Sequence, residues 1–344
     1  MAKRDPFEIG GQVVKPGARM TVDVPVSTLS DHTPVSLAVH VIHGRRPGPV
    51  LFVSAAIHGD EVIGVEIVRR LLRAAPLKGM AGTLLAVPIV NGFGFHNHSR
   101  YLPDRRDLNR CFPGGAEGSM ASRLAHIFME EVVRRADVGI DLHSAAIHRT
   151  NLPQIRLTPG NERLKSLGEA FGAPVMMASK LREGSLRLAA EEEGVDVLLY
   201  EGGEALRFDE LAVRAGVSGC LRVMRRLGMI GSKGVPKRRS VPVVANTSHW
   251  YRAPVGGVFR GYKAIGDAVE PGTVLGAVSD PMGQTDREVV CAEVGIVIGR
   301  SNMPAVYEGE ALFHIAETPR AEHAAEGAAA YMDAAPLYDE DEII

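Results

Sequence analysis

The fold is decided by the stretch Val50-Leu-Phe-Val-Ser-Ala-Ala-Ile-His-Gly-Asp-Glu-Val-Ile-Gly-Val-Glu-Ile-Val-Arg-Arg-Leu-Leu-Arg-Ala-Ala-Pro76. Residues 50–54 are mostly apolar, as expected of a strand that is buried on both faces. Residues 60–75 carry Ile63, Ile67 and Leu71 at a spacing of four, which predicts an amphipathic helix. A buried strand that leads into an amphipathic helix is typical of a parallel sheet with crossover helices.

The alternation of strand and helix continues along the chain. Further strands are expected at residues 83–90, 138–143, 174–177 and 195–200, and further helices at residues 119–136, 161–171, 184–193 and 208–227. Residues 20–43 alternate apolar and polar side chains, which indicates a hairpin or an edge-strand pair. The pattern predicts an α/β domain over residues 1–235, with a largely parallel sheet and helices on both faces.

The C-terminal part of the chain has a different pattern. Helical periodicity ends at the basic linker of residues 231–239, and two related, glycine-punctuated halves follow. They predict a small all-β domain over residues 246–317 that resembles the biotinyl/lipoyl barrel-sandwich fold. Its hairpin at residues 279–286 has no lysine, so we expect this fold without a carried prosthetic group. The Ala- and acid-rich tail, residues 318–344, is expected to be mobile or loosely helical.

Composition excludes several classes of function. A chain of 344 residues suggests two domains, and 39 basic against 41 acidic side chains argue against nucleic acid or a membrane surface as a partner. The longest near-continuous apolar run, residues 50–57, is far shorter than the roughly 20 residues that span a bilayer. The N-terminal residues lack the apolar stretch of a signal peptide, and the three cysteines are scattered. We therefore expect a cytoplasmic globular protein.

Ionisable side chains fall at the ends of three expected strands. His58 and Glu61 follow the first of them, His143 ends the second, and Glu201 follows the third. Ligands bind at the carboxyl ends of strands in an open α/β sheet, so these side chains converge if the strands are neighbours. A His, Glu and His set can hold a catalytic zinc ion and leave one position open for water. A further carboxylate could then take the proton of that water.

Other interpretations of these residues remain open at this point. The spacing of His58 and Glu61 alone is a weak signal, because it also fits a solvated pair on a helix. His96 and His98 are a rival ligand pair in the loop of residues 91–115, although they have no carboxylate in register. The HExxH helix of thermolysin-type enzymes is absent.

Four motifs together resemble the succinylglutamate desuccinylase/aspartoacylase family, a branch of the zinc carboxypeptidase superfamily. They are His58-Gly-Asp-Glu61, Arg100-Tyr-Leu-Pro-Asp-Arg-Arg-Asp107-Leu-Asn109-Arg110-Cys-Phe-Pro-Gly, Asp141-Leu-His143 and Tyr200-Glu201-Gly-Gly. The resemblance covers roughly residues 45–317 and keeps the order of the motifs. It implies a zinc-carboxypeptidase-like mixed, mostly parallel sheet, followed by the small C-terminal β domain.

The resemblance also implies a role for each matched residue. The zinc ligands, for one Zn²⁺ per chain, would be His58, Glu61 and His143. Glu201 would be the general base, and Arg100 would polarise the scissile carbonyl. Asn109 and Arg110 would bind the substrate carboxylate, which suits the planar fork of arginine. Asp107 would either contact the substrate or orient a ligand histidine.

These observations predict a zinc-dependent deacylase that cleaves the amide bond of a small N-acylated amino acid with a metal-bound water. A zinc carboxypeptidase acting on short peptides is the nearest alternative. A non-catalytic binding or carrier protein is an alternative of another class, although the ligand set is complete and the carrier lysine is missing. The expected partner is a small-molecule substrate, with no nucleic acid and no membrane, and a homo-oligomer remains open.

Overall fold

The structure, a computed structural model, describes residues 4–238 and 241–332. Its helices are α1 (Ile63–Arg73), α2 (Gly92–His96), α3 (Met120–Glu131), α4 (Glu162–Phe171), α5 (Leu186–Glu192), α6 (Glu210–Arg226) and α7 (Ala321–Met332), with short 3₁₀ helices η1 (Ala75–Leu77), η2 (Leu108–Arg110) and η3 (Val133–Arg135). Its strands are β1 (Phe7–Ile9), β2 (Gln12–Val14), β3 (Arg19–Thr28), β4 (Pro34–His43), β5 (Arg46–Ala55), β6 (Ala81–Val87), β7 (Val138–Ala145), β8 (Arg149–Leu157), β9 (Val175–Ala178), β10 (Asp196–Glu204), β11 (Val243–Ala245), β12 (Ser248–Arg252), β13 (Gly257–Gly261), β14 (Ala268–Val269), β15 (Val274–Ser279), β16 (Asp286–Val290), β17 (Gly295–Ser301), β18 (Ala305–Val306) and β19 (Ala311–Glu317). Over these residues every helix is too short or too polar to cross a membrane.

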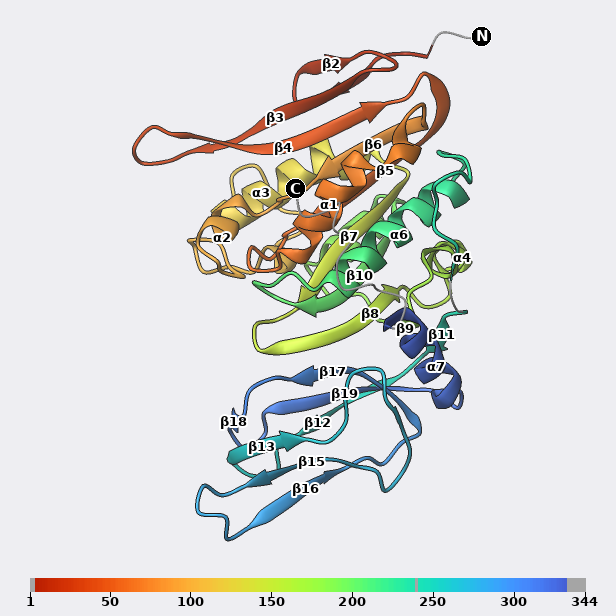
Figure 1. Cartoon of the computed structure of the whole chain (residues 1–344). Coiled ribbons are helices and arrows are strands. Elements are labelled where there is room, and N and C mark those ends of the chain that lie inside the picture. The colour runs from red at the N-terminus through yellow and green to blue at the C-terminus, as the bar shows by residue number, and fades with distance from the viewer. Residues whose placement is uncertain (1–3, 239–240, 333–344) are drawn as a thin grey trace.

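One large sheet organises the molecule (Figure 1). In its centre β10, β7, β5 and β6 are neighbours in that order, and each pair is parallel. On one side β4 and β3 continue the sheet as the antiparallel pair expected at residues 20–43. On the other side β8 pairs antiparallel with β10. The sheet is therefore mixed with a parallel centre, as the resemblance implied.

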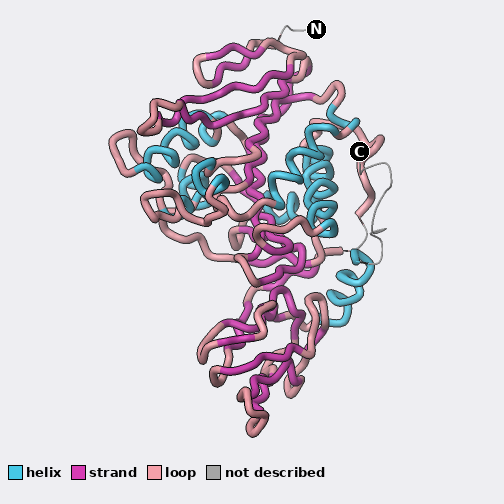
Figure 2. Tube along the Cα trace, turned by 60° about the vertical axis from the view of Figure 1, so that its left-hand side comes forward, coloured by secondary structure: helices cyan, strands magenta, loops and turns pink. Residues whose placement is uncertain are grey.

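Helices cover both faces of this sheet (Figure 2). Helices α1, α4 and α6 share a core on one face, and Ile63, Ile67 and Leu71 of α1 are fully buried in it. Helices α3 and α5 pack on the other face, in a core that contains Phe52 and Phe128. The stripe of side chains at a spacing of four is thus the buried face of α1.

The C-terminal strands form two sheets, and one of them continues the central sheet. Strand β17 pairs antiparallel with β8, and β19 and β12 follow in the same sheet. The second sheet, in the order β16-β15-β13-β18, packs against it around a core that includes Phe259, Leu275 and Phe313. The hairpin at residues 279–286 joins β15 to β16. The all-β region is therefore hydrogen-bonded to the central sheet, which the sequence pattern did not predict.

Strand β8 was not expected from the sequence, because Pro153 and polar side chains interrupt its pattern. Proline cannot donate a backbone hydrogen bond and is rare inside a sheet. Residues 149–151 pair with β17, whereas residues 154–157 pair with β9, so Pro153 lies at the change of neighbour. The strand thereby tolerates a residue that normally marks an edge.

The described part of the tail is helical, one of the two states expected for it, but this helix is packed and not loose. Helix α7 packs Ala324 and Ala328 into a core with Ile296 and Ile298 of β17. The hydroxyl of Tyr331 accepts a hydrogen bond from Arg222 Nη2 of α6 at 3.3 Å. Residues 321–332 are thus a packed helix that bridges the C-terminal strands and the helical layer, and residues 333–344 lie outside the described residues.

Gly139 provides a test of how the centre of the sheet is packed. A Cβ atom there would lie 2.1 Å from Cζ of Phe52, whose ring already packs edge-on against Phe128. Gly139→Ala should therefore lower the free energy of unfolding by about 1–3 kcal/mol in a urea titration followed by circular dichroism. Gly231→Ala is the matched control, because a Cβ there meets no atom within 4 Å. Equal stability of the two variants would contradict this packing.

Candidate metal centre and active-site pocket

The three strands that carry the ionisable residues are neighbours. Strand β7 lies between β5 and β10, and Glu201 of β10 is directly opposite His143 of β7. His58 follows β5, the other neighbour of β7. The expected convergence at the carboxyl ends of these strands is therefore confirmed.

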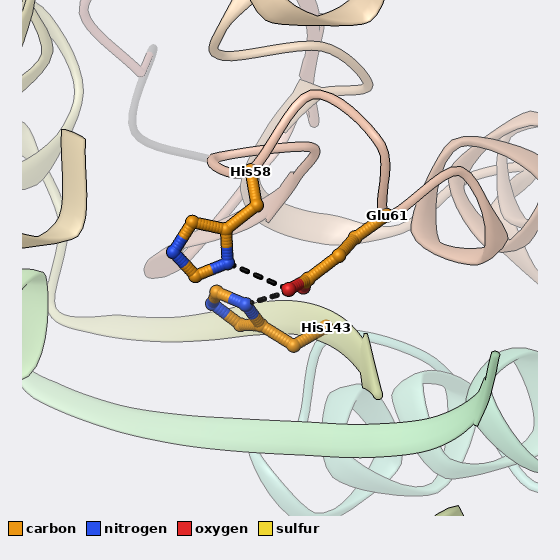
Figure 3. Close-up of side chains that lie close together, drawn as sticks. All are labelled: His58, Glu61 and His143. Carbon is orange, nitrogen blue, oxygen red and sulfur yellow. Dashed lines mark hydrogen bonds and ion pairs between the residues drawn. The ribbon is translucent and has the colours of Figure 1, made fainter. Parts of the chain in front are cut away.

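The carboxylate of Glu61 lies between the imidazoles of His58 and His143 (Figure 3). The Nδ1 atom of each histidine is 2.7 Å from a different oxygen of Glu61, and all three side chains are buried. The backbone amide of Ser144 donates a further hydrogen bond to Glu61 Oε2 at 3.1 Å. One potential ligand atom from each residue lies within 4.8 Å of the other two, so the cluster could hold a metal ion.

Charge dominates the protonation of this cluster. Burial raises the pKa of Glu61, but the positive charges of His58 and His143 outweigh burial and hold that pKa well below its usual range. Burial likewise lowers the pKa of His143, and the carboxylates of Asp141 and Glu61 outweigh it and raise the value. The buried carboxylate therefore needs positive charge beside it, which protons on the imidazoles or a bound divalent cation can supply.

The second ring nitrogen of each histidine is held by another carboxylate. His143 Nε2 donates to Asp141 Oδ2 at 2.6 Å, and His58 Nε2 donates to Asp107 Oδ1 at 3.2 Å. The hydroxyl of Ser54 fixes Asp141 in turn, at 2.8 Å. Histidines that bind metals almost always donate their other N–H group in this way, because it orients the ring and fixes the tautomer. The donor set of this chain therefore fits a divalent metal such as zinc.

Arg100 and Asp107 lie beside the cluster. Arg100 donates to Asp107 Oδ2 through Nη2 at 3.0 Å and to Glu61 Oε1 through Nη1 at 3.3 Å. Asp107 also caps η2 by accepting a hydrogen bond from the amide of Asn109 at 2.9 Å. Of the two roles considered for Asp107, these contacts favour orienting His58 over touching a substrate.

Asn109 and Arg110 follow on η2 and face the same pocket. The side-chain oxygen of Asn109 accepts a hydrogen bond from the amide of Leu186 at 2.9 Å, which ties the loop to the start of α5. Arg110 is exposed, its Nη1 donates a hydrogen bond to the backbone carbonyl of Asn109, and it forms no ion pair with a carboxylate among the described residues. The rival histidines, His96 and His98, are exposed and do not line the pocket.

The pocket has a volume of about 490 Å³ and a large excess of positive charge. Its basic side chains are Arg100, Arg110, Arg149, Arg156, Lys180, Arg182 and Arg187, whereas its only carboxylates within the described chain are Glu61 and Glu201. Arg187 is the most buried of these cations, and burial lowers its pKa to about 10. The Nε atom of Arg187 has no hydrogen-bond partner among the described residues. The pocket therefore suits an anionic small molecule.

Sequence reasoning missed the side of the pocket that β8 and the C-terminal strands form. Arg149 and Arg156 belong to the unexpected strand β8, and Ser248, Trp250 and His314 come from β12 and β19. A signal was present, because Trp250 is the only tryptophan in the chain. The place of Trp250 in the pocket wall nevertheless depends on pairing between strands that are distant in sequence, which the local sequence pattern does not reveal.

Comparison with known proteins finds several relatives. A family model described as succinylglutamate desuccinylase/aspartoacylase catalytic domain matches residues 47–227, which is more than half of the chain and a range that includes the site residues predicted above. The N-alpha-acetyl-L-2,4-diaminobutyric acid deacetylase of Halomonas elongata is 26% identical over 287 residues, which are 79% of this chain and 83% of that protein. The succinylglutamate desuccinylase of Pseudomonas aeruginosa is 34% identical over 196 residues, which are 51% of this chain and 57% of that protein.

Solved structures share the fold over nearly the whole chain. The product-bound ectoine utilization protein EutE (DoeB) of Ruegeria pomeroyi has a TM-score of 0.80 at 22% identity, over 92% of this chain and 100% of that one. A succinylglutamate desuccinylase/aspartoacylase structure from Rhodobacter sphaeroides has a TM-score of 0.78 at 23% identity, over 91% and 96% of the two chains. These likenesses extend through both the central sheet and the C-terminal strands.

Metal binding can be tested directly. We expect the purified protein to bind about one divalent ion per chain, and His143→Ala to lose that ion, because two remaining ligands rarely hold zinc. The measurement is metal content by mass spectrometry after dialysis against zinc. His96→Ala, an exposed histidine outside the pocket, is the control and should keep its metal. A fully metallated His143→Ala protein would show that the cluster is not the metal site.

Proposed function

Because the chain belongs to the succinylglutamate desuccinylase/aspartoacylase family, we propose that it is a zinc-dependent hydrolase that removes the acyl group from a small N-acylated amino acid. Deacylases of N-acylated amino acids among its relatives support amide hydrolysis as the reaction. The observation that carries the proposal is the buried cluster of His58, Glu61 and His143 with Glu201 in the same pocket.

The metal-binding part of the proposal rests on the donor set. His58 and His143 would each offer Nδ1, and Glu61 would offer its carboxylate. When bound, Zn²⁺ supplies a Lewis acid and lowers the pKa of water to about 7. Asp141 and Asp107 hold the opposite ring nitrogens, so both imidazoles would keep their orientation through turnover.

Glu201 is the proposed general base. Its Oε2 accepts a hydrogen bond from Asn151 Nδ2 at 3.0 Å, and Arg156 Nη2 lies 3.7 Å from Oε1, too far for a hydrogen bond. Oε1 therefore stays available to accept a proton from the attacking water and to pass it to the leaving nitrogen. Asn151 would keep the carboxylate from rotating during that transfer.

The amino-acid part of the substrate would lie at the loop that carries η2. We assign its carboxylate to Arg110 with help from Asn109, because Arg110 offers a planar fork that no acid within residues 4–238 and 241–332 neutralises. Arg100, beside Glu61, would polarise the scissile carbonyl.

The alternatives have less support. A carboxypeptidase that acts on short peptides would need room for a chain on both sides of the scissile bond, whereas this pocket measures about 490 Å³ and strands β12 and β19 contribute to its wall. A carrier protein would need a lysine in the β15–β16 hairpin, and residues 279–286 contain none.

The role of Glu201 predicts a specific defect. Glu201→Gln keeps the shape of the side chain but cannot accept a proton, so kcat should fall by about 10²- to 10⁴-fold while zinc content stays unchanged. Steady-state kinetics and metal analysis of the same sample measure both. Glu192→Gln, at the exposed end of α5 and outside the pocket, is the control. If kcat of Glu201→Gln stays within about threefold of wild type, Glu201 is structural.

The role of Arg110 predicts a preference for a free carboxylate. A charged hydrogen bond is worth about 1.5–3 kcal/mol, so wild type should favour an N-acyl amino acid over its amide by at least about tenfold in kcat/KM. Arg110→Ala should remove most of that preference, and Arg110→Lys should weaken it because lysine lacks the two-pronged geometry. Arg106→Ala, an exposed arginine of the same loop outside the pocket, should leave the preference intact. Equal rates on acid and amide in wild type would refute the assignment.

A further inference from the structure

Glu204 lies at the end of β10, shortly after Glu201, and bridges two turns that are far apart in the sequence. Its Oε1 atom accepts a hydrogen bond from the backbone amide of His148 at 2.9 Å, in the turn between β7 and β8. Its Oε2 atom accepts a hydrogen bond from Nδ2 of Asn302 at 3.0 Å, in the turn that follows β17. The side chain of Glu204 is only 13% exposed, so these contacts replace most of its contact with water. We call the two hydrogen bonds the Glu204 bridge.

The turn between β7 and β8 has a backbone conformation that needs support. His148 has a φ of 64°, in the left-handed region, which costs free energy in a residue that carries a Cβ atom. Such a conformation persists where the surrounding structure fixes it. Here Glu204 holds the amide of His148, and the carbonyl of His148 accepts a hydrogen bond from the amide of Asn302 at 2.8 Å. The turn is therefore fixed from outside, by Glu204 and Asn302.

The same turn forms part of the pocket wall beside the metal-binding cluster. Ala145, Ala146 and Arg149 line the pocket. The residue that precedes them, Ser144, donates its backbone amide to Glu61 at 3.1 Å. A shift of the turn would therefore change the shape of the pocket at a place next to the cluster.

Asn302 joins the C-terminal strands to this arrangement. The pairing of β8 with β17 ends at Arg149 and Ser301, and Asn302 is the next residue. Its Nδ2 atom donates to Thr150 Oγ1 at 2.7 Å as well as to Glu204. The Glu204 bridge thus continues the junction between β10, β8 and β17 beyond the last strand pair. A carboxylate suits this position, because it offers only acceptors and both of its partners are N–H donors.

We propose that Glu204 is a positioning residue that holds the pocket wall of residues 145–149 in place by fixing the β7–β8 turn to the C-terminal strands. The inference rests on the proposed deacylase function and deepens it, because it adds a residue on which substrate binding depends. The wall contacts a substrate alike in the ground state and in the transition state. Loss of the bridge should therefore weaken substrate binding more than it slows the chemical step.

Glu204→Gln tests the bridge with the smallest change of shape. Glutamine offers one acceptor and one donor at the end of its side chain, so it can keep only one of the two hydrogen bonds. With the N-acetyl amino acid that wild type hydrolyses fastest, KM should rise by about threefold to tenfold, while kcat stays within about twofold and zinc content is unchanged. Arg207→Gln is the matched control, because it removes only an exposed ion pair with Glu204 Oε2, and such pairs contribute little.

A swap of donor and acceptor separates this contact from a general loss of stability. Asn302→Asp alone places two carboxylates together, so KM should rise at least as much as in Glu204→Gln. In the double variant Glu204→Gln/Asn302→Asp, the amide group at position 204 can donate to the carboxylate at position 302, and its oxygen can still accept from His148. KM of the double variant should return to within about twofold of wild type, as expected of a coupled pair.

Three results would overturn the positioning role while leaving the deacylase function intact. The first is an unchanged KM in both single variants. The second is a double variant in which the two increases of KM multiply, since the contact between positions 204 and 302 would then not be their cause. The third is a fall in Tm and kcat at unchanged KM, which would make Glu204 a residue of the fold alone.

A wild-type enzyme that hydrolyses no N-acyl amino acid would instead refute the proposed function, and hydrogen–deuterium exchange then decides the role of Glu204. The backbone amides of residues 146–150 should exchange faster in Glu204→Gln than in wild type, in Arg207→Gln and in the double variant, because the turn opens more often without its support. Equal exchange in all four proteins would show that Glu204 does not hold this wall.

Discussion

The site depends on the parallel pairing of one strand, β7, with neighbours on both sides. Because β5, β7 and β10 run in the same direction, the residues at their carboxyl ends reach the same edge of the sheet. His143 is thereby set opposite Glu201 and next to the turn that carries His58 and Glu61. The burial of Glu61 between two imidazoles is tolerable only with this arrangement, since an isolated buried carboxylate would be neutralised instead. The apolar faces of α1 and α6 pack against these strands and help to hold them in this arrangement.

Much of this site could be predicted because its signals are local. An apolar run of strand length, followed at once by His58 and Glu61, or ended by His143, marks the end of a buried strand without knowledge of the rest of the fold. Asp141 and Asp107 could be suspected only from the family resemblance, because their contacts with the histidine rings depend on side-chain orientation. Residues 149–157 escaped prediction because Pro153 breaks the pattern of the strand. The proline is tolerated because it lies where the neighbour of β8 changes from β17 to β9, and this change of neighbour is visible only in the fold.

The joining of the C-terminal strands to the central sheet escaped prediction for a different reason. Their composition of short, glycine-punctuated strands indicates a separate β unit, and nothing in residues 295–301 reveals that they pair with β8. The pairing has a direct effect on the pocket. Strand β17 is hydrogen-bonded to β8, and β8 is hydrogen-bonded to β10, which carries Glu201. The C-terminal wall of the pocket is therefore held at a fixed position relative to Glu201, whereas a domain on a flexible linker would let the two sides of the pocket move apart. Contacts with both ends of a substrate can thus be held at a constant separation.

Helix α7 covers apolar surface of the C-terminal strands, so its removal would affect the solubility of the protein. The helix covers Ile296 and Ile298 of β17 with Ala324 and Ala328, and Leu152 of β8 lies in the same apolar cluster. A chain cut before Ala321 would keep every residue of the pocket yet expose this cluster to solvent at the junction of the two β regions. Contiguous apolar surface of this kind drives association between molecules. Helix α7 therefore protects solubility at a place remote from the pocket, and a protein shortened before Ala321 would be expected to aggregate although the cluster of His58, Glu61 and His143 is intact.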